Sequence, residues 1–198
     1  LGRQKGARLG AAVDTAGDLN GDGYSDVVVG VPNLDNTTAG GRVLVYYGGP
    51  AGLPVKPGWT ATGDQGLAEF GGAVATAGDL NGDGYADLAI GAPGYDAVGL
   101  PDAGAAFVYL GAARGLGEPG TPSNADWAVY GDAAGARLGS DLGTAGDVNR
   151  DGYDDLIVGV PSHTANRGRA YVYYGGAVLD GTADWKAEGP LPGGNFGF

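Results

Sequence analysis

The sequence predicts an all-β protein built from blades of a β-propeller. An acidic, glycine-containing loop recurs three times in the 198 residues, beginning at Asp18, Asp79 and Asp147. Short apolar runs separated by glycine and proline surround each copy, and no stretch has the period of an amphipathic helix. Four short strands fit into each repeat of about 60 to 70 residues, which is the size of a propeller blade.

Three repeats account for nearly the whole chain. An apolar residue followed by glycine precedes each loop, as in Phe70-Gly71, and a Gly-x-Pro signal follows it, as in Gly91-Ala92-Pro93. Phe196-Gly197 begins the same pattern once more. Because propellers have about four to eight blades, three cannot close a ring, and we expect a partial or open propeller. The predicted organisation is one partial propeller over 1–198, with repeats at about 9–69, 70–137 and 138–195 and a fourth just begun at 196–198.

The four strands of each repeat follow one order of composition. The first strand is made of small residues and ends near Thr-Ala-Gly. The second and third are rich in β-branched and aromatic residues, which suit a pleated, half-buried surface. The fourth begins with a tryptophan that we expect to pack between blades. The predicted strands are 11–16, 26–30, 42–47, 59–63, 73–77, 87–91, 105–110, 127–131, 141–145, 155–159, 169–174 and 185–188.

Each recurring loop carries oxygen donors in a pattern that suits calcium. Aspartate stands at positions 1, 5 and 9, asparagine at position 3, and a tyrosine that offers its carbonyl at position 7. A hard dication takes about six to eight oxygen ligands, and glycine at position 6 allows the loop to turn sharply around one ion. We therefore expect three structural Ca²⁺ ions. The predicted ligands are Asp18, Asn20, Asp22, Tyr24 and Asp26; Asp79, Asn81, Asp83, Tyr85 and Asp87; and Asp147, Asn149, Asp151, Tyr153 and Asp155.

A simple hairpin turn is the alternative reading of these loops, because Asn-Gly and Asp-Gly between apolar runs are strong hairpin signals. The third loop, however, has Arg150 where the first two have Gly21 and Gly82, while every oxygen donor recurs. Carboxylates crowded into one loop would also repel each other without a cation. The pattern thus favours a metal. It is not an EF-hand, because an apolar residue such as Val29 occupies position 12 in place of a bidentate glutamate.

Charge and composition narrow the functional classes. The formal net charge is −12, and three aspartates in each loop contribute nine of the 23 acidic residues. Much of the acidity is therefore explained by the proposed sites, and no basic stripe indicates nucleic-acid binding. The chain has no cysteine, and no apolar run is long enough to span a membrane.

Together these signals resemble the FG-GAP repeats of the integrin α-chain β-propeller and of many bacterial extracellular proteins. Phe70-Gly71 and Gly91-Ala92-Pro93 match the name of the motif, whereas Leu9 and Leu138 depart from it conservatively. The resemblance implies calcium in the loop between the first two strands of each blade and an extracellular, secreted or cell-surface location. The propellers of that family usually have more blades, so we expect further blades of a parent chain, or self-association, at the open ends.

The expected function is that of a calcium-binding extracellular scaffold or adhesion module, which binds a protein or glycan partner through its loops. The alternative is an accessory propeller region of a secreted, phospholipase- or lyase-like hydrolase whose catalytic domain lies elsewhere. We expect no catalytic residues and no enzymatic activity in this segment. The only histidine, His163, is expected to be a solvated loop side chain.

Candidate partner contacts lie on the face opposite the calcium loops, which the integrin relatives use for partner binding. Variable loops on a rigid scaffold are where binding residues tend to lie. The candidates are Asp35, Asn36, Tyr95, Asp96, Asp102, His163 and Arg167.

Overall fold

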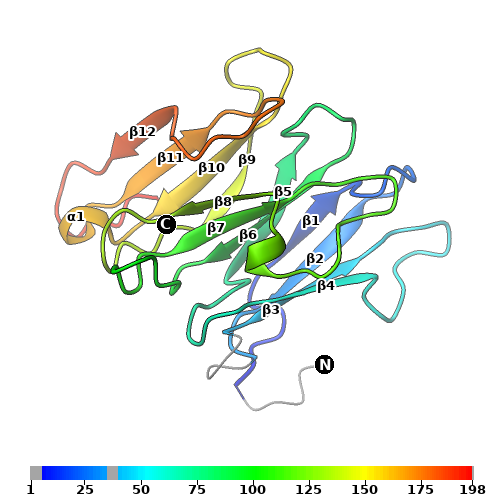
Figure 1. The fold of residues 1–198 in the computed structure, drawn as a ribbon, viewed down its shortest axis with the longest axis horizontal. Helices are drawn as coiled ribbons and strands as arrows, with labels where there is room; N and C mark the ends of the chain where they lie inside the picture. Colours follow the sequence, from blue (N-terminus) through cyan, green and yellow to red (C-terminus); the bar gives the residue numbers. More distant parts are fainter. Residues whose placement is uncertain (1–5, 35–39, 198) are drawn as a thin grey trace.

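The protein forms three four-stranded antiparallel sheets placed side by side as consecutive blades (Figure 1). The computed structural model describes residues 6–34 and 40–197. Each sheet is a meander in chain order, so the predicted all-β class with four-stranded propeller blades is confirmed. The blades consist of β1 (Val13–Gly17), β2 (Asp26–Val31), β3 (Arg42–Tyr46) and β4 (Trp59–Thr62); β5 (Ala73–Gly78), β6 (Asp87–Ala92), β7 (Ala105–Tyr109) and β8 (Trp127–Tyr130); and β9 (Leu142–Gly146), β10 (Asp155–Val160), β11 (Arg169–Tyr173) and β12 (Trp185–Glu188).

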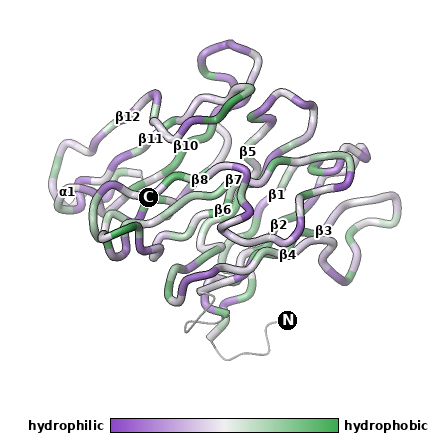
Figure 2. Tube along the Cα trace, in the orientation of Figure 1, coloured by the Kyte–Doolittle hydropathy of each residue, from purple (hydrophilic) through white to green (hydrophobic). Residues whose placement is uncertain are grey.

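The first strands of the blades line the inner side of the arc, where β1 lies against β5 and β5 lies against β9. These strands can approach closely because they consist mainly of small residues. Two short helical turns, η1 (Pro122–Asn124) and α1 (His163–Asn166), interrupt the loops and were not expected. Most hydrophilic residues lie in the loops at the ends of the strands (Figure 2). The described residues contain no helix that is long and apolar enough to cross a membrane.

Two hydrophobic clusters lie between the blades, one at each junction. The fourth-strand tryptophans anchor both clusters, as predicted. Trp59 packs edge-on against Tyr109 with ring centroids 5.2 Å apart, and Trp127 packs in the same way on Tyr173 at 5.1 Å. The third tryptophan, Trp185, is 47% exposed, against 2% and 8% for the other two. The outer face of the third blade therefore carries the same packing surface without a described neighbour.

The two glycine signals of the repeat meet in space and join neighbouring blades. Within a repeat, the amide of Gly71 donates to the carbonyl of Gly91 at 2.9 Å. Between repeats, a Cβ atom added to Gly91 would lie 2.1 Å from the carbonyl oxygen of Gly139 in the next blade. The same approach recurs from Gly30 to Gly71 and from Gly159 to Gly197, at 2.1 and 2.0 Å. Each second strand thus needs a glycine at the point where the next repeat crosses it.

The C-terminal Phe196-Gly197 docks on the third blade in the same manner. Phe196 forms a parallel bridge with Gly168, as Phe70 does with Gly41 and Leu138 with Gly104. The residues predicted to open a fourth repeat therefore also complete the edge of the third blade. Phe196 remains 42% exposed, whereas Phe70 is fully buried, since a further blade covers Phe70 and none is described beside Phe196.

A side chain at the glycine contact should destabilise the fold. We expect Gly91→Ala to lower the free energy of unfolding by about 1 to 3 kcal/mol, because the added methyl group forces two blades apart. Gly143→Ala is the matched control, since an added Cβ there meets nothing within 4 Å. Urea unfolding of both variants measures the difference. Equal stabilities would contradict the proposed role of the glycine contact.

Candidate metal centre

The three predicted loops occupy equivalent places, each joining the first strand of a blade to its second strand. The side chains at positions 1, 3 and 5 lie together at the surface and bond to the turning backbone. In the first loop, Asp18 accepts hydrogen bonds from the amides of Asp22 and Gly23 at 3.1 and 2.8 Å. Asn20 Oδ1 accepts from the amide of Asp22, and Asp22 Oδ1 accepts from the amide of Tyr24, both at 3.0 Å. The same four bonds recur in the second loop and in the third.

The position-9 aspartates are fully buried and anchor the loop to the blade. In the first blade, Asp26 accepts from the amide of Leu19 at 2.9 Å and from the amide of Gly48 at 2.8 Å. Asp87 and Asp155 make the equivalent pairs of bonds in the other two blades. The carboxylate thus ties the start of the loop to the turn after the third strand. This anchoring role was not predicted.

The asparagine side chain donates a hydrogen bond to the position-5 aspartate of the same loop. The Nδ2 atoms of Asn20, Asn81 and Asn149 donate to the outer oxygens of the position-5 aspartates at 3.2, 2.9 and 2.7 Å. As the side chains stand, residues 6–34 and 40–197 contain no group of three Asp, Glu or His side chains arranged to hold a metal ion. A cation at this loop would have to displace the amide nitrogen from the carboxylate.

The donor set nevertheless has the chemistry that calcium requires. All side-chain donors are carboxylate or amide oxygens, the ligands that hard dications prefer. A carboxylate oxygen that accepts one backbone hydrogen bond keeps a second lone pair for a cation. The structure gathers the side chains of positions 1, 3 and 5 at each surface turn, and the position-9 side chain is buried below the turn. Because these side chains are not arranged around a cation, the assignment of fifteen ligand residues stays a prediction.

Burial and like charge act on two of the position-9 carboxyl groups, those of Asp26 and Asp87. Burial raises the pKa of Asp87 to about 7, and the nearby charges of Asp83 and Asp79 add to this effect. Burial likewise raises the pKa of Asp26, with smaller contributions from Asp18 and Asp22. Two backbone hydrogen bonds oppose the rise in each case. The groups that act on these two carboxyls include no positive charge.

The first and second loops are each bonded to the next blade. The carbonyls of Asp18 and Leu19 accept from the amides of Ala86 and Ala112 at 3.1 and 3.0 Å. The carbonyls of Asp79 and Leu80 accept from the amides of Asp154 and Gly176 at 3.0 and 2.7 Å in the same way. An ion in one loop would consequently stiffen a junction between two blades.

The position-4 glycines have a packing role in this junction. A Cβ atom at Gly21 would lie 2.5 Å from the ring of Tyr85, and one at Gly82 would lie 2.7 Å from the ring of Tyr153. The tyrosine of each following loop thus packs over the glycine of the preceding one. Arg150, at the equivalent position of the third loop, is exposed and keeps a left-handed backbone conformation with a φ of 62°.

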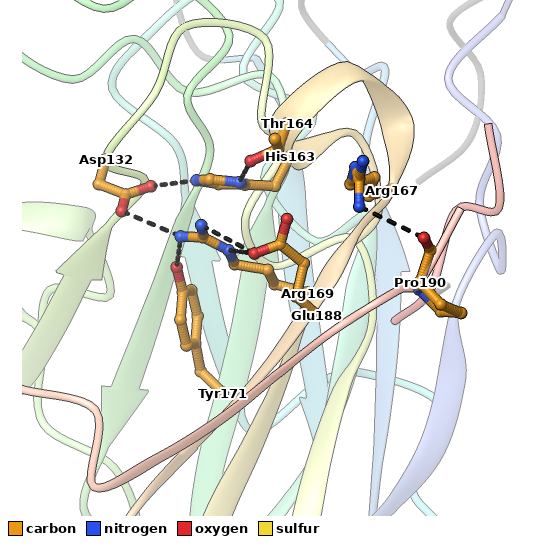
Figure 3. Close-up of polar contacts among 8 residues, drawn as sticks. All are labelled: Asp132, His163, Thr164, Arg167, Arg169, Tyr171, Glu188 and Pro190. Atoms are coloured by element: carbon orange, nitrogen blue, oxygen red, sulfur yellow. Dashed lines mark hydrogen bonds and ion pairs between the residues drawn. The ribbon is translucent and has the colours of Figure 1, made fainter. Parts of the chain in front are cut away.

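His163 is buried, so the expectation of a solvated loop histidine was wrong. Its exposed fraction is 7%, and its Nε2 atom lies 2.9 Å from Asp132 Oδ1 while Nδ1 bonds to the hydroxyl of Thr164 (Figure 3). Two hydrogen bonds compensate for the loss of solvent around the ring. Tertiary contacts across two blades determine this burial, and the local sequence gives no sign of them.

The other candidate partner contacts differ in exposure. Asp35 and Asn36 lie outside the described residues. Asp96 and Asp102 are exposed, and Asp96 Oδ1 accepts from the Asp102 amide at 2.8 Å. Tyr95 is half-buried against Phe107, and Arg167 donates to the carbonyl of Pro190 at 3.3 Å. Asp96 and Asp102 are therefore the most accessible of the described candidates.

Comparison with known proteins identifies the repeats. The model of the FG-GAP repeat family matches residues 9–46, 70–109 and 138–173, which together make up more than half of the chain. The chain belongs to the FG-GAP repeat family. Each matched segment of this FG-GAP protein runs from the apolar-glycine signal to the third strand of a blade.

Three relatives show how widely this FG-GAP sequence is shared. Over 80% of this chain, the sequence is 35% identical to integrin alpha-4 of Xenopus laevis. Over 96% of this chain, it is 37% identical to integrin alpha-V of Gallus gallus. It is 33% identical to phosphatidylinositol-glycan-specific phospholipase D of Homo sapiens over 97%. The matched region is only 15%, 18% and 24% of these relatives, so their whole-protein activities do not transfer with the repeats.

The metal-free protein should become less stable as the pH rises. The folded pKa of Asp87 is about 7, raised from 3.8, so between these values the folded state binds more protons than the unfolded state. Stability then falls with increasing pH through this window, by at most about 1.4 kcal/mol per pH unit for this group.

Urea unfolding in chelator from about pH 5 to about pH 8 measures this slope. The Asp87→Asn variant is the control, since it cannot titrate and should show a weaker dependence. A wild-type stability that rises between about pH 5 and about pH 7 would contradict the raised pKa.

Proposed function

We propose that the three loops bind Ca²⁺ and that the protein is a calcium-stabilised extracellular scaffold. One observation carries the proposal: three surface turns repeat the same oxygen donors and the same hydrogen bonds, although the third differs in sequence at position 4. A hairpin turn requires only the glycines, whereas the recurrence of aspartate at positions 1, 5 and 9 is accounted for by a cation. Asp26 and Asp87 are buried without an opposite charge, which raises their pKa values and supports the same conclusion.

A bound ion would be held by the carboxylates, the asparagine oxygen and the tyrosine carbonyl of each loop, at the positions given above. It would supply positive charge to the loop and has no role in turnover. Because the first and second loops are bonded to the next blade, we propose that calcium stabilises the two junctions as well as the loops.

Calcium should raise the stability of the fold. If each site has a dissociation constant of about 0.1 mM, about 2 mM calcium adds about 1.8 kcal/mol per site by mass action. The melting temperature should therefore fall on chelation, and Asp83→Ala should remove about a third of the calcium-dependent difference.

Asp14→Ala is the control for this experiment, since Asp14 is an exposed aspartate of β1 outside the loops. Differential scanning calorimetry with and without chelator measures both variants. An unchanged wild-type melting temperature in chelator would indicate simple turns and would refute the proposal.

We further propose that the module is extracellular or secreted and binds a protein or glycan partner through loops of the scaffold. The similarity to integrin α-chains supports this adhesion role. The exposed packing surface around Trp185 supports a further blade, from a longer chain or a second copy, on the third blade. We propose no catalytic role for the segment.

A second candidate function follows from the phospholipase D relatives, whose similarity extends over 97% of this chain. In that case the blades would form an accessory region of a secreted hydrolase, and catalysis would belong to another domain. The flanking coding sequence distinguishes the two functions, since a hydrolase domain supports the second and additional adhesion or stalk domains support the first.

A further inference from the structure

The groove between the second and third blades is bordered by a shorter loop than the groove between the first and second. In both grooves, the tryptophan of the earlier blade donates to a carbonyl in the loop before the last strand of the later blade. Trp59 Nε1 donates to Gly117 at 2.8 Å, and Trp127 Nε1 donates to Asp180 at 2.6 Å. The two loops are therefore equivalent up to this point.

The loops then diverge, because residues 118–126 follow in the second blade and only residues 181–184 follow in the third. The longer loop runs back along the outer edge of β4, where Gly120 forms a parallel bridge with Ala61. The carbonyl of Gly120 accepts from the Thr62 amide at 2.8 Å. The chain thus adds a short strand segment to the outer edge of its own first blade.

No described segment adds to the outer edge of β8 in this way. The amides of Gly63 and Gly131 both donate inward, to Gly41 and Gly104. The preceding amides, those of Thr62 and Tyr130, therefore point to the outer edge, since the direction alternates along a strand. Thr62 is paired by Gly120, whereas Tyr130 offers the same donor to the open groove.

The open groove has a volume of about 320 Å³. Val129, Leu138, Tyr171 and Tyr173 contribute apolar surface, and the charged side chains that line it are Asp132, Arg169 and Lys186. Tyr130 borders the groove from β8, while its ring packs against Tyr95 and Phe107 with centroids 5.8 and 6.2 Å away. The groove therefore combines an aromatic surface with a mixed polar border.

The polar border is held in place by its own contacts (Figure 3). Arg169 bonds to the hydroxyl of Tyr171 at 3.2 Å and to Glu188 at 3.1 Å, and Asp132 bonds to the buried His163 at 2.9 Å. A preformed border reduces the ordering cost of binding.

We propose that this groove binds an extended peptide segment of a protein partner, which pairs with the outer edge of β8 as Gly120 pairs with β4. Strand addition to an exposed sheet edge is an established mode of peptide recognition. The proposal goes beyond calcium binding and does not depend on an ion in the loops.

The paired example in the first groove indicates the peptide chemistry. A Cβ atom at Gly120 would lie 2.6 Å from the ring of Trp59 and 2.7 Å from the carbonyl of Thr60. Trp127 occupies the equivalent place in the second groove, so the partner needs glycine at the pairing position. Lys186 in the border favours an acidic residue nearby, which Glu118 provides in the chain's own segment.

The test uses a synthetic peptide, acetyl-Gly-Glu-Pro-Gly-Thr-Pro-Ser-amide, which copies residues 117–123. Titration into ¹⁵N-labelled protein should shift the amide resonances of Tyr130, Asp132 and Lys186. Tyr130→Pro removes the outward amide, which an edge strand tolerates, and should weaken binding at least about tenfold. Tyr130→Phe keeps the amide and should bind like the wild type.

A second variant keeps the test decisive if Tyr130→Pro does not fold. Inserting a copy of residues 118–122 after Asp180 should fill the groove and abolish the shifts, whereas a Gly-Ser insertion of equal length should fill it less and retain binding. Absence of shifts in the wild type up to about 10 mM peptide, a limit that corresponds to about −2.7 kcal/mol, would overturn the proposal. So would equal binding to the folded Tyr130→Pro variant, or shifts with maltohexaose alone, which would assign the groove to glycans.

Discussion

The close approach of glycine backbones between blades is the contact on which the rest of this structure depends. At Gly30, Gly91 and Gly159 the second strand of a blade passes so near the carbonyl of the next repeat that a side chain cannot fit. The hydrogen bonds and bridges around these glycines set the distance between sheets. That distance determines whether Trp59 and Trp127 can reach the carbonyls of the following blade. The two motifs that give the repeat its name are thus parts of one joint.

The acidic loops form a second joint at the opposite ends of the same strands. In the first and second loops, the position-1 and position-2 carbonyls accept hydrogen bonds from the next blade, and the position-4 glycines pack against its tyrosines. A cation in such a loop would act on a structural junction, because the residues around it already connect two blades. The proposed calcium binding would therefore be coupled to blade packing, and the buried Asp26 and Asp87 would take part in both.

The twelve strands could be predicted from the sequence alone because each of the four strands of a blade occurs in three repeats that can be compared. Gly-rich turns, the apolar runs and the tryptophans recur in register, so errors at one copy are corrected by the others. The packing role of Gly21 and Gly82 was not accessible, since it requires knowing that Tyr85 and Tyr153 pack over the preceding loops. The burial of His163 and the anchoring bonds of Asp26 depend on contacts between distant segments, which no local pattern encodes.

The open groove beside β8 was also beyond sequence reasoning, although a sign of it exists. The segment between the third and fourth strands is longer in the second blade than in the third. Only the structure shows that the extra residues of the longer segment pair with β4, and thus that the shorter one leaves an edge unpaired. The difference in loop length between these two repeats therefore corresponds to a difference in which strand edge is covered.

The central claim is that each of the three loops binds one calcium ion. The most direct test is a crystal structure at millimolar calcium, with anomalous scattering used to identify the ions. The account predicts one anomalous peak per loop, within about 2.3 to 2.6 Å of oxygens of Asp22, Asp83 and Asp151. Water molecules or empty density at those positions would contradict it.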